Sequence, residues 1–239
     1  EGVEDEVIAK ADAIIANPEA SPLDKSSAAY IAAAAWQNKD TSDYANAIKY
    51  YQIAIAANGL HNNSHYRAMM NMANMMESDG KHEDALKAID TYITETKSDD
   101  ASAWNIKARA LASLDRPAEA ATALEKLAAA KPDDKAIQMA LASAYMQADQ
   151  DAKAAAVFDR LHSKGMLTES KDYEAGFRLL ANIDGRKKDA LALIEEGMSK
   201  GIMQPSAEAY DLQAHAFYDD TTSPRRSSTG PRAPRWRRP

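Results

Sequence analysis

Apolar and small residues recur at helical spacing on two neighbouring segments between residues 101 and 134. Helical spacing places such residues on one face of each helix, and the alanines among them allow two helix backbones to approach closely. We expect Asp115 to cap the second helix, and Pro132 to end it. A helix pair this small cannot bury its apolar face alone, so it needs neighbours on both sides. The two packing sets are Trp104, Ala108 and Leu111 in the first helix and Ala120, Leu124 and Leu127 in the second.

The flanking sequence repeats this unit with variations. A leading helix is predicted over residues 3–16, followed by helix pairs whose boundaries coincide with Pro, Gly, Asn and Ser. Ser21 has the Ser, Pro and acid pattern of a helix start, and Asn58-Gly59 is expected to be a left-handed helix stop. The predicted pairs lie at 22–37 with 43–57, 64–78 with 82–96, the central unit, 135–165 and 169–200, and a further helix begins at Ser206.

The order Trp, small residue, Leu, Ala, Leu and Pro in the central unit resembles the tetratricopeptide repeat, a unit of about 34 residues. This resemblance implies an all-α fold, a right-handed superhelical solenoid, over residues 1–220 with about six helix pairs plus flanking helices. It also implies a protein that binds a peptide or partner segment in a concave groove lined by the first helix of each repeat.

The repeat positions that face this groove in the family give a set of candidate binding residues. Amides both donate and accept hydrogen bonds, and guanidinium groups present a planar fork, so both suit the backbone or carboxylates of an extended segment. The Lys and Asn set that holds the C-terminal carboxylate of chaperone tails is absent from matching positions. The candidates are Arg67, Met70, Asn71, Asn74, Asn105, Arg109, Met139, Ser143, Gln147 and Arg178.

Five methionines fall in the helix predicted at 64–78. Met69, Met72 and Met76 fit its packing face, which leaves Met70 nearer the groove. A methionine cluster can also form an adaptable binding surface, but the spacing favours core filling.

The sequence contains no motif for catalysis, for a cofactor or for a metal. It has no cysteine, no phosphate-binding glycine loop, no nucleophile elbow and no apolar run long enough to span a membrane. His61 and His65 have a ligand-like spacing without a fixed third ligand, and Leu86 stands where a zinc-protease motif starting at His82 needs its second histidine. We therefore expect a non-enzymatic protein with no cofactor and no metal.

The net charge of −7 combines two different parts of the chain. Residues 221–239 contain six arginines and no acid, so removing those six positive charges leaves −13 on the remainder. An acidic body argues against nucleic-acid binding through the body. The alternatives are an enzyme with its site in the groove, and a nucleic-acid or anionic-surface binder that acts through the basic tail.

The segment 221–239 does not continue the repeat pattern. A second helix should follow the one that begins at Ser206, yet Arg, Pro, Ser and Thr dominate the tail. A shifted reading frame would permit a continuation with Pro, Ala and aromatic residues at repeat positions, so we expect either a frame-shifted end or a disordered Arg-rich tether. The oligomeric state is left open by the sequence.

The N-terminal residue is Glu1 and not Met, which fits removal of a secretory signal. The alanine-rich repeats are also similar in style to those of bacterial envelope proteins. We therefore expect a periplasmic or cell-envelope location, with the cytoplasm as the alternative.

Overall fold

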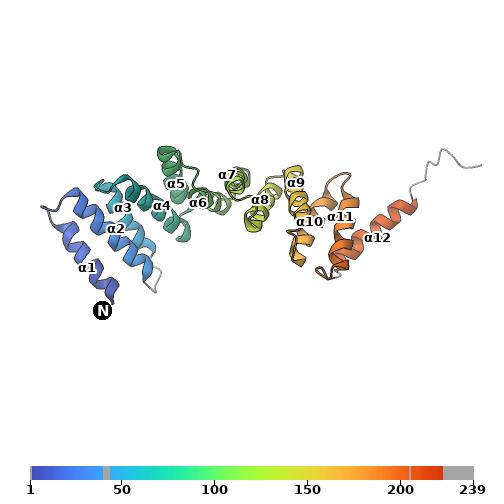
Figure 1. Ribbon diagram of the computed structural model, residues 1–239, viewed down its shortest axis with the longest axis horizontal. Helices are drawn as coiled ribbons and strands as arrows, with labels where there is room; N and C mark the ends of the chain where they lie inside the picture. The colour runs from blue at the N-terminus through green and yellow to red at the C-terminus, as the bar shows by residue number, and fades with distance from the viewer. Residues whose placement is uncertain (1, 40–43, 205, 223–239) are drawn as a thin grey trace, which may run out of the picture. The chain divides into compact units, whose positions relative to one another are not determined.

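The computed structural model describes residues 2–39, 44–204 and 206–222, and side-chain environments are described up to residue 214. All regular structure in these residues is α-helical (Figure 1). The chain forms two compact units, divided after Leu161. The tail was predicted to begin at residue 221, but α12 extends through Thr222. The rest of the predicted tail, 223–239, lies outside the described residues. The first unit contains α1 (Val3–Ala16), α2 (Pro22–Asn38), α3 (Tyr44–Ala56), α4 (Asn62–Ser78), α5 (His82–Thr96), α6 (Ala101–Ser113), α7 (Pro117–Ala130), α8 (Lys135–Gln147) and most of α9 (Asp151–Ser163). The second unit contains α10 (Ser170–Asn182), α11 (Lys187–Ser199) and α12 (Ala207–Thr222).

Each helix of the first unit packs against the next one along the chain, from α1 to α8. The first helices α4 and α6 of two successive repeats also contact each other directly. Short connections and neighbour-only packing are what a repeat architecture requires, because each pair buries its apolar face on the adjacent pairs. The all-α repeat fold expected from the sequence is therefore confirmed.

Alanine forms much of the core at the helix contacts. Ala29, Ala73 and Ala142 on first helices and Ala85 and Ala154 on second helices are fully buried. Because Ala has only a methyl group, helix backbones approach closely at these points, and larger side chains fill the space around them. Ala108 and Ala120 of the central unit are buried in the same way.

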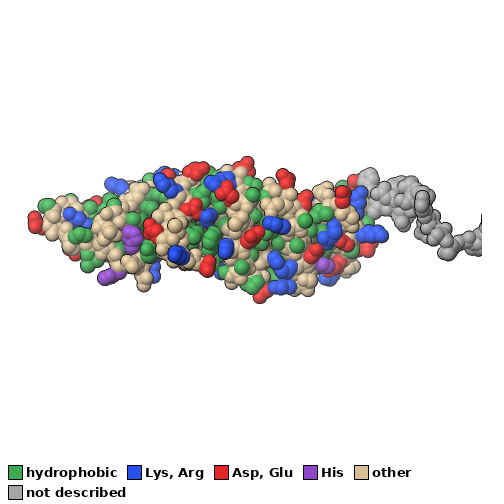
Figure 2. All heavy atoms as spheres, turned by 90° about the horizontal axis from the view of Figure 1, so that it is seen from above, with side chains coloured by type: hydrophobic (Ala, Val, Ile, Leu, Met, Phe, Trp, Pro, Cys, Tyr) green, Lys and Arg blue, Asp and Glu red, His purple; other side chains and the backbone are tan. Residues whose placement is uncertain are grey.

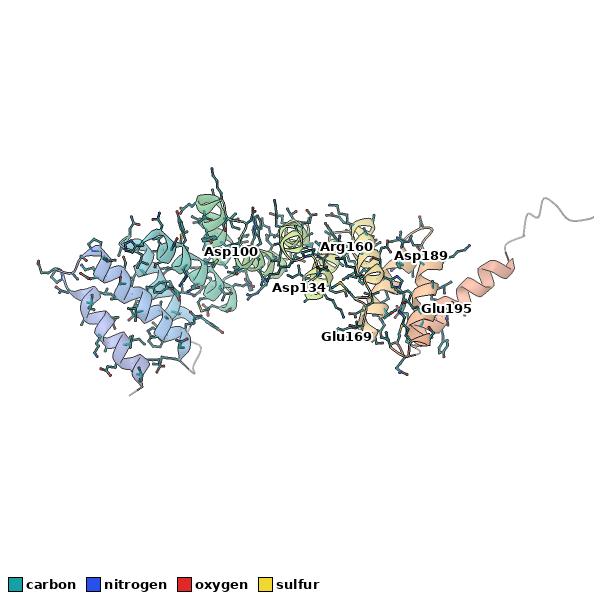
Figure 3. All side chains as sticks on the ribbon, in the orientation of Figure 1. Asp100, Asp134, Arg160, Glu169, Asp189 and Glu195 are labelled. Atoms are coloured by element: carbon teal, nitrogen blue, oxygen red, sulfur yellow. The ribbon has the colours of Figure 1, made fainter. Side chains whose placement is uncertain are left out.

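Capping side chains define the starts of α2, α6 and α8. Ser21 accepts a hydrogen bond from the Asp24 amide at 3.1 Å, and the Asp24 carboxylate accepts one from the Ser21 amide, which completes a capping box. Asp100 and Asp134 cap α6 and α8 through hydrogen bonds from the amides of Ser102 at 2.7 Å and Ile137 at 3.2 Å (Figure 3).

Two local expectations were wrong and a third was right. The residue that caps α7 is Arg116, because Asp115 has a positive φ of 55° and ends α6 in the left-handed conformation. The left-handed helix stop expected at Asn58-Gly59 is present at the end of α3, where Asn58 has a positive φ of 50°. In α4, the structure buries Met75 with Met69 and Met76, whereas Met72 is only half-buried.

Candidate functional site

A hollow of about 510 Å³ lies in the first unit between the first helices of three successive repeats. It is lined by side chains of α4 and α6, by the first turn of α8, and by the end of α7. The lining residues are Met70, Asn71, Asn74, Ala101, Ser102, Asn105, Ile106, Arg109, Leu127, Lys131, Asp134, Ala136 and Ile137.

Five of the groove candidates line this hollow together. Met70, Asn71 and Asn74 lie on α4, and Asn105 and Arg109 lie on α6. The spacings of three or four residues place them on one side of each helix, and the direct contact between α4 and α6 brings the two sides together.

The other candidates lie elsewhere. Arg67 is exposed one turn before Met70 and does not line the hollow. Met139, Ser143 and Gln147 on α8 are also absent from its lining, since α8 contributes only its first turn. Gln147 instead donates a hydrogen bond to Ser143 at 3.1 Å.

Arg178 belongs to the second unit and is already ion-paired there. Its Nε lies 2.8 Å from a carboxylate oxygen of Glu208 on α12, and its Nη2 lies 3.5 Å from Glu174 on the same helix. Arg178 is not among the residues that line the hollow.

Hydrogen bonds between repeats hold the polar side chains of the hollow. Asn71 donates to the Tyr51 hydroxyl at 3.1 Å, and that hydroxyl donates to Gln37 at 3.1 Å. Burial raises the pKa of Tyr51, and the hydrogen bond from Asn71 opposes part of that rise. Across the hollow, Arg109 donates to the Asn74 amide oxygen at 3.2 Å. These links fix the side chains before any partner binds.

Sequence reasoning missed the apolar floor and one of the two cations. Ile106 and Leu127 are nearly fully buried and form the base of the hollow, while Lys131 lies exposed at its edge. Leu127 lies on α7, a second helix, and Lys131 directly follows that helix, so a search restricted to first helices overlooks them. The sequence did contain one indication of this role. Lys131 directly precedes Pro132, in the turn that leads into α8.

The chemistry of the hollow suits binding more than catalysis. Of its described lining residues, only Asp134 has a carboxylate, and that carboxylate caps α8. Arg109 and Lys131 are its cations. Two cations, several amides and an apolar floor can hold an extended polypeptide through its carbonyl and carboxylate oxygens and an apolar side chain.

A second hollow, of about 430 Å³, lies between α7, α8 and α9. Its polar groups are engaged with one another: Tyr145 donates to Glu125 at 2.5 Å, and Arg160 donates to the buried Gln138 at 2.6 Å. Burial, with the hydrogen bond to Glu125, raises the pKa of Tyr145 to about 12. These contacts join successive repeats.

Metal binding and membrane insertion find no support in the described part of the chain. No cluster of three or more His, Asp and Glu side chains there could hold a metal ion. The ring of His65 packs against Tyr66, and His82 Nδ1 lies 2.7 Å from the buried Glu77 carboxylate. No described helix is both long and apolar enough to cross a bilayer. On the face shown in Figure 2, acidic and basic side chains are interspersed.

Comparison with known proteins places these repeats in a family. Two models of the tetratricopeptide repeat match residues 32–102 with 77–133 and residues 111–165, which together cover more than half of the chain. No curated protein sequence matches the chain.

Several solved structures share the fold. A tetratricopeptide repeat protein from Parabacteroides merdae has a TM-score of 0.55 at 17% identity, covering 91% of this chain and 79% of its own. MamA from Desulfovibrio magneticus has a TM-score of 0.53 at 15% identity, covering 68% and 85%. PilF from Pseudomonas aeruginosa has a TM-score of 0.53 at 16% identity, covering 89% and 97%. Identities this low show a shared fold alone, whereas the repeat matches show that this chain belongs to the tetratricopeptide repeat family.

Proposed function

We propose that this protein is a non-enzymatic scaffold that holds an extended segment of a partner protein in the hollow between α4, α6 and the start of α8. Tetratricopeptide repeats bind protein partners, and the observation that supports this particular site is the gathering of side chains from three repeats around one hollow. Asn74, Asn105 and Arg109 would bind backbone or carboxylate oxygens of the segment. The floor at Ile106 and Leu127 would receive an apolar side chain.

The hydrogen bonds inside the hollow support this proposal energetically. Asn71 and Arg109 are positioned by neighbouring repeats, so a bound segment would not need to order them. Preorganisation of this kind reduces the entropic cost of binding. An enzyme that acts in the same hollow is disfavoured, because Asp134 is engaged as a cap and none of the described lining residues is a histidine.

The test begins with selection of binding peptides from a phage-displayed library of random peptides, using the full chain as bait. Affinities of the selected peptides are then measured by fluorescence anisotropy for wild type and for an Asn74→Ala, Arg109→Glu double variant. We expect at least about tenfold weaker binding, since hydrogen bonds to a charged group contribute about 1.5–3 kcal/mol.

The matched control is Lys126→Glu, the same charge reversal at an exposed position on α7 that does not line the hollow. This control should bind the selected peptides as tightly as wild type does. Failure to enrich any peptide, or equal losses in both variants, would contradict the proposed site.

A further inference from the structure

The chain contains one Asn-Gly pair, Asn58-Gly59, which lies in the connection between α3 and α4. In such a pair, the backbone nitrogen of glycine can attack the side-chain carbonyl carbon of asparagine and form a five-membered imide ring. Glycine favours this attack because it has no side chain to shield its nitrogen and restricts the backbone least. Asn58 is exposed, so water has access to the ring once it has formed.

The folded connection holds the attacking nitrogen away from this reaction. The Gly59 amide donates a hydrogen bond at 2.9 Å to the hydroxyl of Ser26, which is fully buried on α2. A Cβ atom at Gly59 would overlap backbone atoms of the first turn of α2, so this peptide unit has no room to rotate. The preceding amide, that of Asn58, donates to the Ile55 carbonyl at 3.1 Å. Ring closure therefore requires the connection to separate from α2.

We propose that Asn58-Gly59 is a site of spontaneous deamidation, which the hydrogen bond to Ser26 suppresses in the folded chain and local opening of the connection permits. In this reaction the Gly59 nitrogen loses its proton and bonds to Cγ of Asn58, and the bond from Cγ to the side-chain nitrogen breaks and releases ammonia. Water then opens the imide ring. Hydrolysis of the bond between Cγ and nitrogen leaves aspartate, and hydrolysis of the backbone bond leaves isoaspartate, in which the main chain runs through Cγ.

The two products differ in their effect on the repeat. Aspartate keeps the length of the main chain and tolerates the left-handed φ of 50° at Asn58. Isoaspartate adds one carbon atom to the main chain before Gly59, and this extra length does not fit a connection that already lies directly against α2. Isoaspartate therefore prevents the hydrogen bond to Ser26 from forming again. These residues do not line the hollow between α4, α6 and α8, so this proposal is independent of the binding function.

The rate of deamidation depends on how often the connection opens. Local segments open with free energies that range from near zero to that of global unfolding. Folded wild type should therefore lose Asn58 at least about tenfold more slowly than the denatured chain does. Loss of one internal hydrogen bond raises the population of the open form, so Ser26→Ala should lose Asn58 about three- to tenfold faster than folded wild type.

The experiment follows deamidation of the full chain with time at mildly alkaline pH, with and without guanidinium chloride. Trypsin cuts after Lys49 and Arg67, and fragmentation of the resulting peptide in a mass spectrometer locates the change at Asn58. Asn62 and Asn63 in the same peptide precede residues with side chains, so they are internal references that should react more slowly in the denatured chain. Labelling by an isoaspartyl methyltransferase measures the isoaspartate product.

Ser113→Ala is the matched control for Ser26→Ala. It also removes a hydroxyl that makes a hydrogen bond, to Glu77 at 3.2 Å, but it lies at the end of α6. This control should leave the rate at Asn58 unchanged, and circular dichroism shows whether each variant is folded. If Ser26→Ala does not fold, hydrogen exchange of wild type provides the test. In guanidinium chloride below the unfolding transition, exchange of the Gly59 amide and deamidation should accelerate together.

Any of four results would overturn the proposal. In the denatured chain, Asn58 could react no faster than Asn62 and Asn63. Folded and denatured wild type could lose Asn58 at the same rate, or folded Ser26→Ala could react no faster than Ser113→Ala. Deamidation of wild type that does not follow exchange of the Gly59 amide would also show that opening of the connection does not control the reaction.

Discussion

Replacing Gly59 by alanine tests whether glycine is needed there because a side chain would not fit, and not because of its backbone conformation. Gly59 lies in the connection between α3 and α4, and a Cβ atom there would overlap the carbonyl group of Pro22 and the amide nitrogen of Leu23. These are backbone atoms of the first turn of α2, so they cannot rotate away. The Gly59 amide also donates to the fully buried Ser26 hydroxyl at 2.9 Å.

The magnitude follows from these two contacts. Carbon atoms pack best at about 3.5–4.0 Å, so the new methyl must displace α2 from the connection. Overpacking of this kind costs about 1–3 kcal/mol, and an unsatisfied buried hydroxyl adds about 1–3 kcal/mol. Alanine also lowers the conformational entropy of the unfolded chain, which stabilises the folded protein by about 0.4–1 kcal/mol. We therefore expect Gly59→Ala to lower the free energy of unfolding by about 2–4 kcal/mol.

Gly80→Ala is the matched control. Gly80 has a positive φ of 77°, but nothing lies within 4 Å of an added Cβ, so its cost is limited to left-handed backbone strain of about 1–2 kcal/mol. Urea unfolding followed by far-UV circular dichroism measures the free energy of unfolding of both variants. If Gly59→Ala cost no more than Gly80→Ala, the close approach of the connection to α2 would be refuted.

Three further predictions concern other close contacts and one ion pair. Ala120→Leu should cost about 1–3 kcal/mol in thermal unfolding, since Ala120 is buried between helices; an unchanged melt would contradict the helix register. Gly197→Ala should lower the melting temperature because its methyl would lie 2.9 Å from the Tyr173 ring, whereas helix propensity alone, about 1 kcal/mol in favour of Ala, would raise it. The pKa of Glu196 is lowered to about 2, mainly by the hydrogen bond from Lys200. The ionised Glu196 therefore stabilises the folded protein fully above the ordinary carboxylate pKa, and this contribution is lost as the pH falls from about 5 to about 2. Urea titrations against pH should show this loss in wild type and not in Glu196→Gln; parallel curves would exclude it.

The helices were predictable because their causes are local. The predicted ranges 3–16 and 82–96 agree with α1 and α5, since the apolar period and the residues at the helix ends define both. Repeat proteins bury their faces on sequence neighbours, so few long-range contacts compete with local preference.

The ends of helices were less predictable where the same residue type can serve two roles. Asp100 and Asp134 cap helices through their carboxylates, but Asp115 ends a helix through a left-handed backbone. Asp is suited to both, so its sequence position does not decide between them. Gly59 is required by a contact with the start of α2, a helix that precedes it by one repeat, which the pattern around Gly59 cannot indicate.

The candidate site was predictable only in part for the same reason. Positions facing the groove on α4 and α6 follow from helical period, and Met70, Asn74, Asn105 and Arg109 do line the hollow. Whether α8 contributes its first turn or its middle depends on the angle between repeats. That angle is set by how side chains pack between helices. The sequence alone therefore could not show that Ser143 does not line the hollow.

The division between buried and groove-facing positions explains why the fold is easier to recognise than the function. The small residues at helix contacts, such as Ala73 on α4 and Ala108 on α6, fix the distance between backbones and tolerate little change. Asn74 and Arg109, each one residue further along, face the hollow, where any side chain that fits the partner is compatible with the same fold. This chain can therefore share its architecture with proteins that are only 15–17% identical to it, and a shared fold does not imply a shared function. The partner proposed above should accordingly be sought through the chemistry of the hollow itself, which is rich in amides, contains two cations and has an apolar floor.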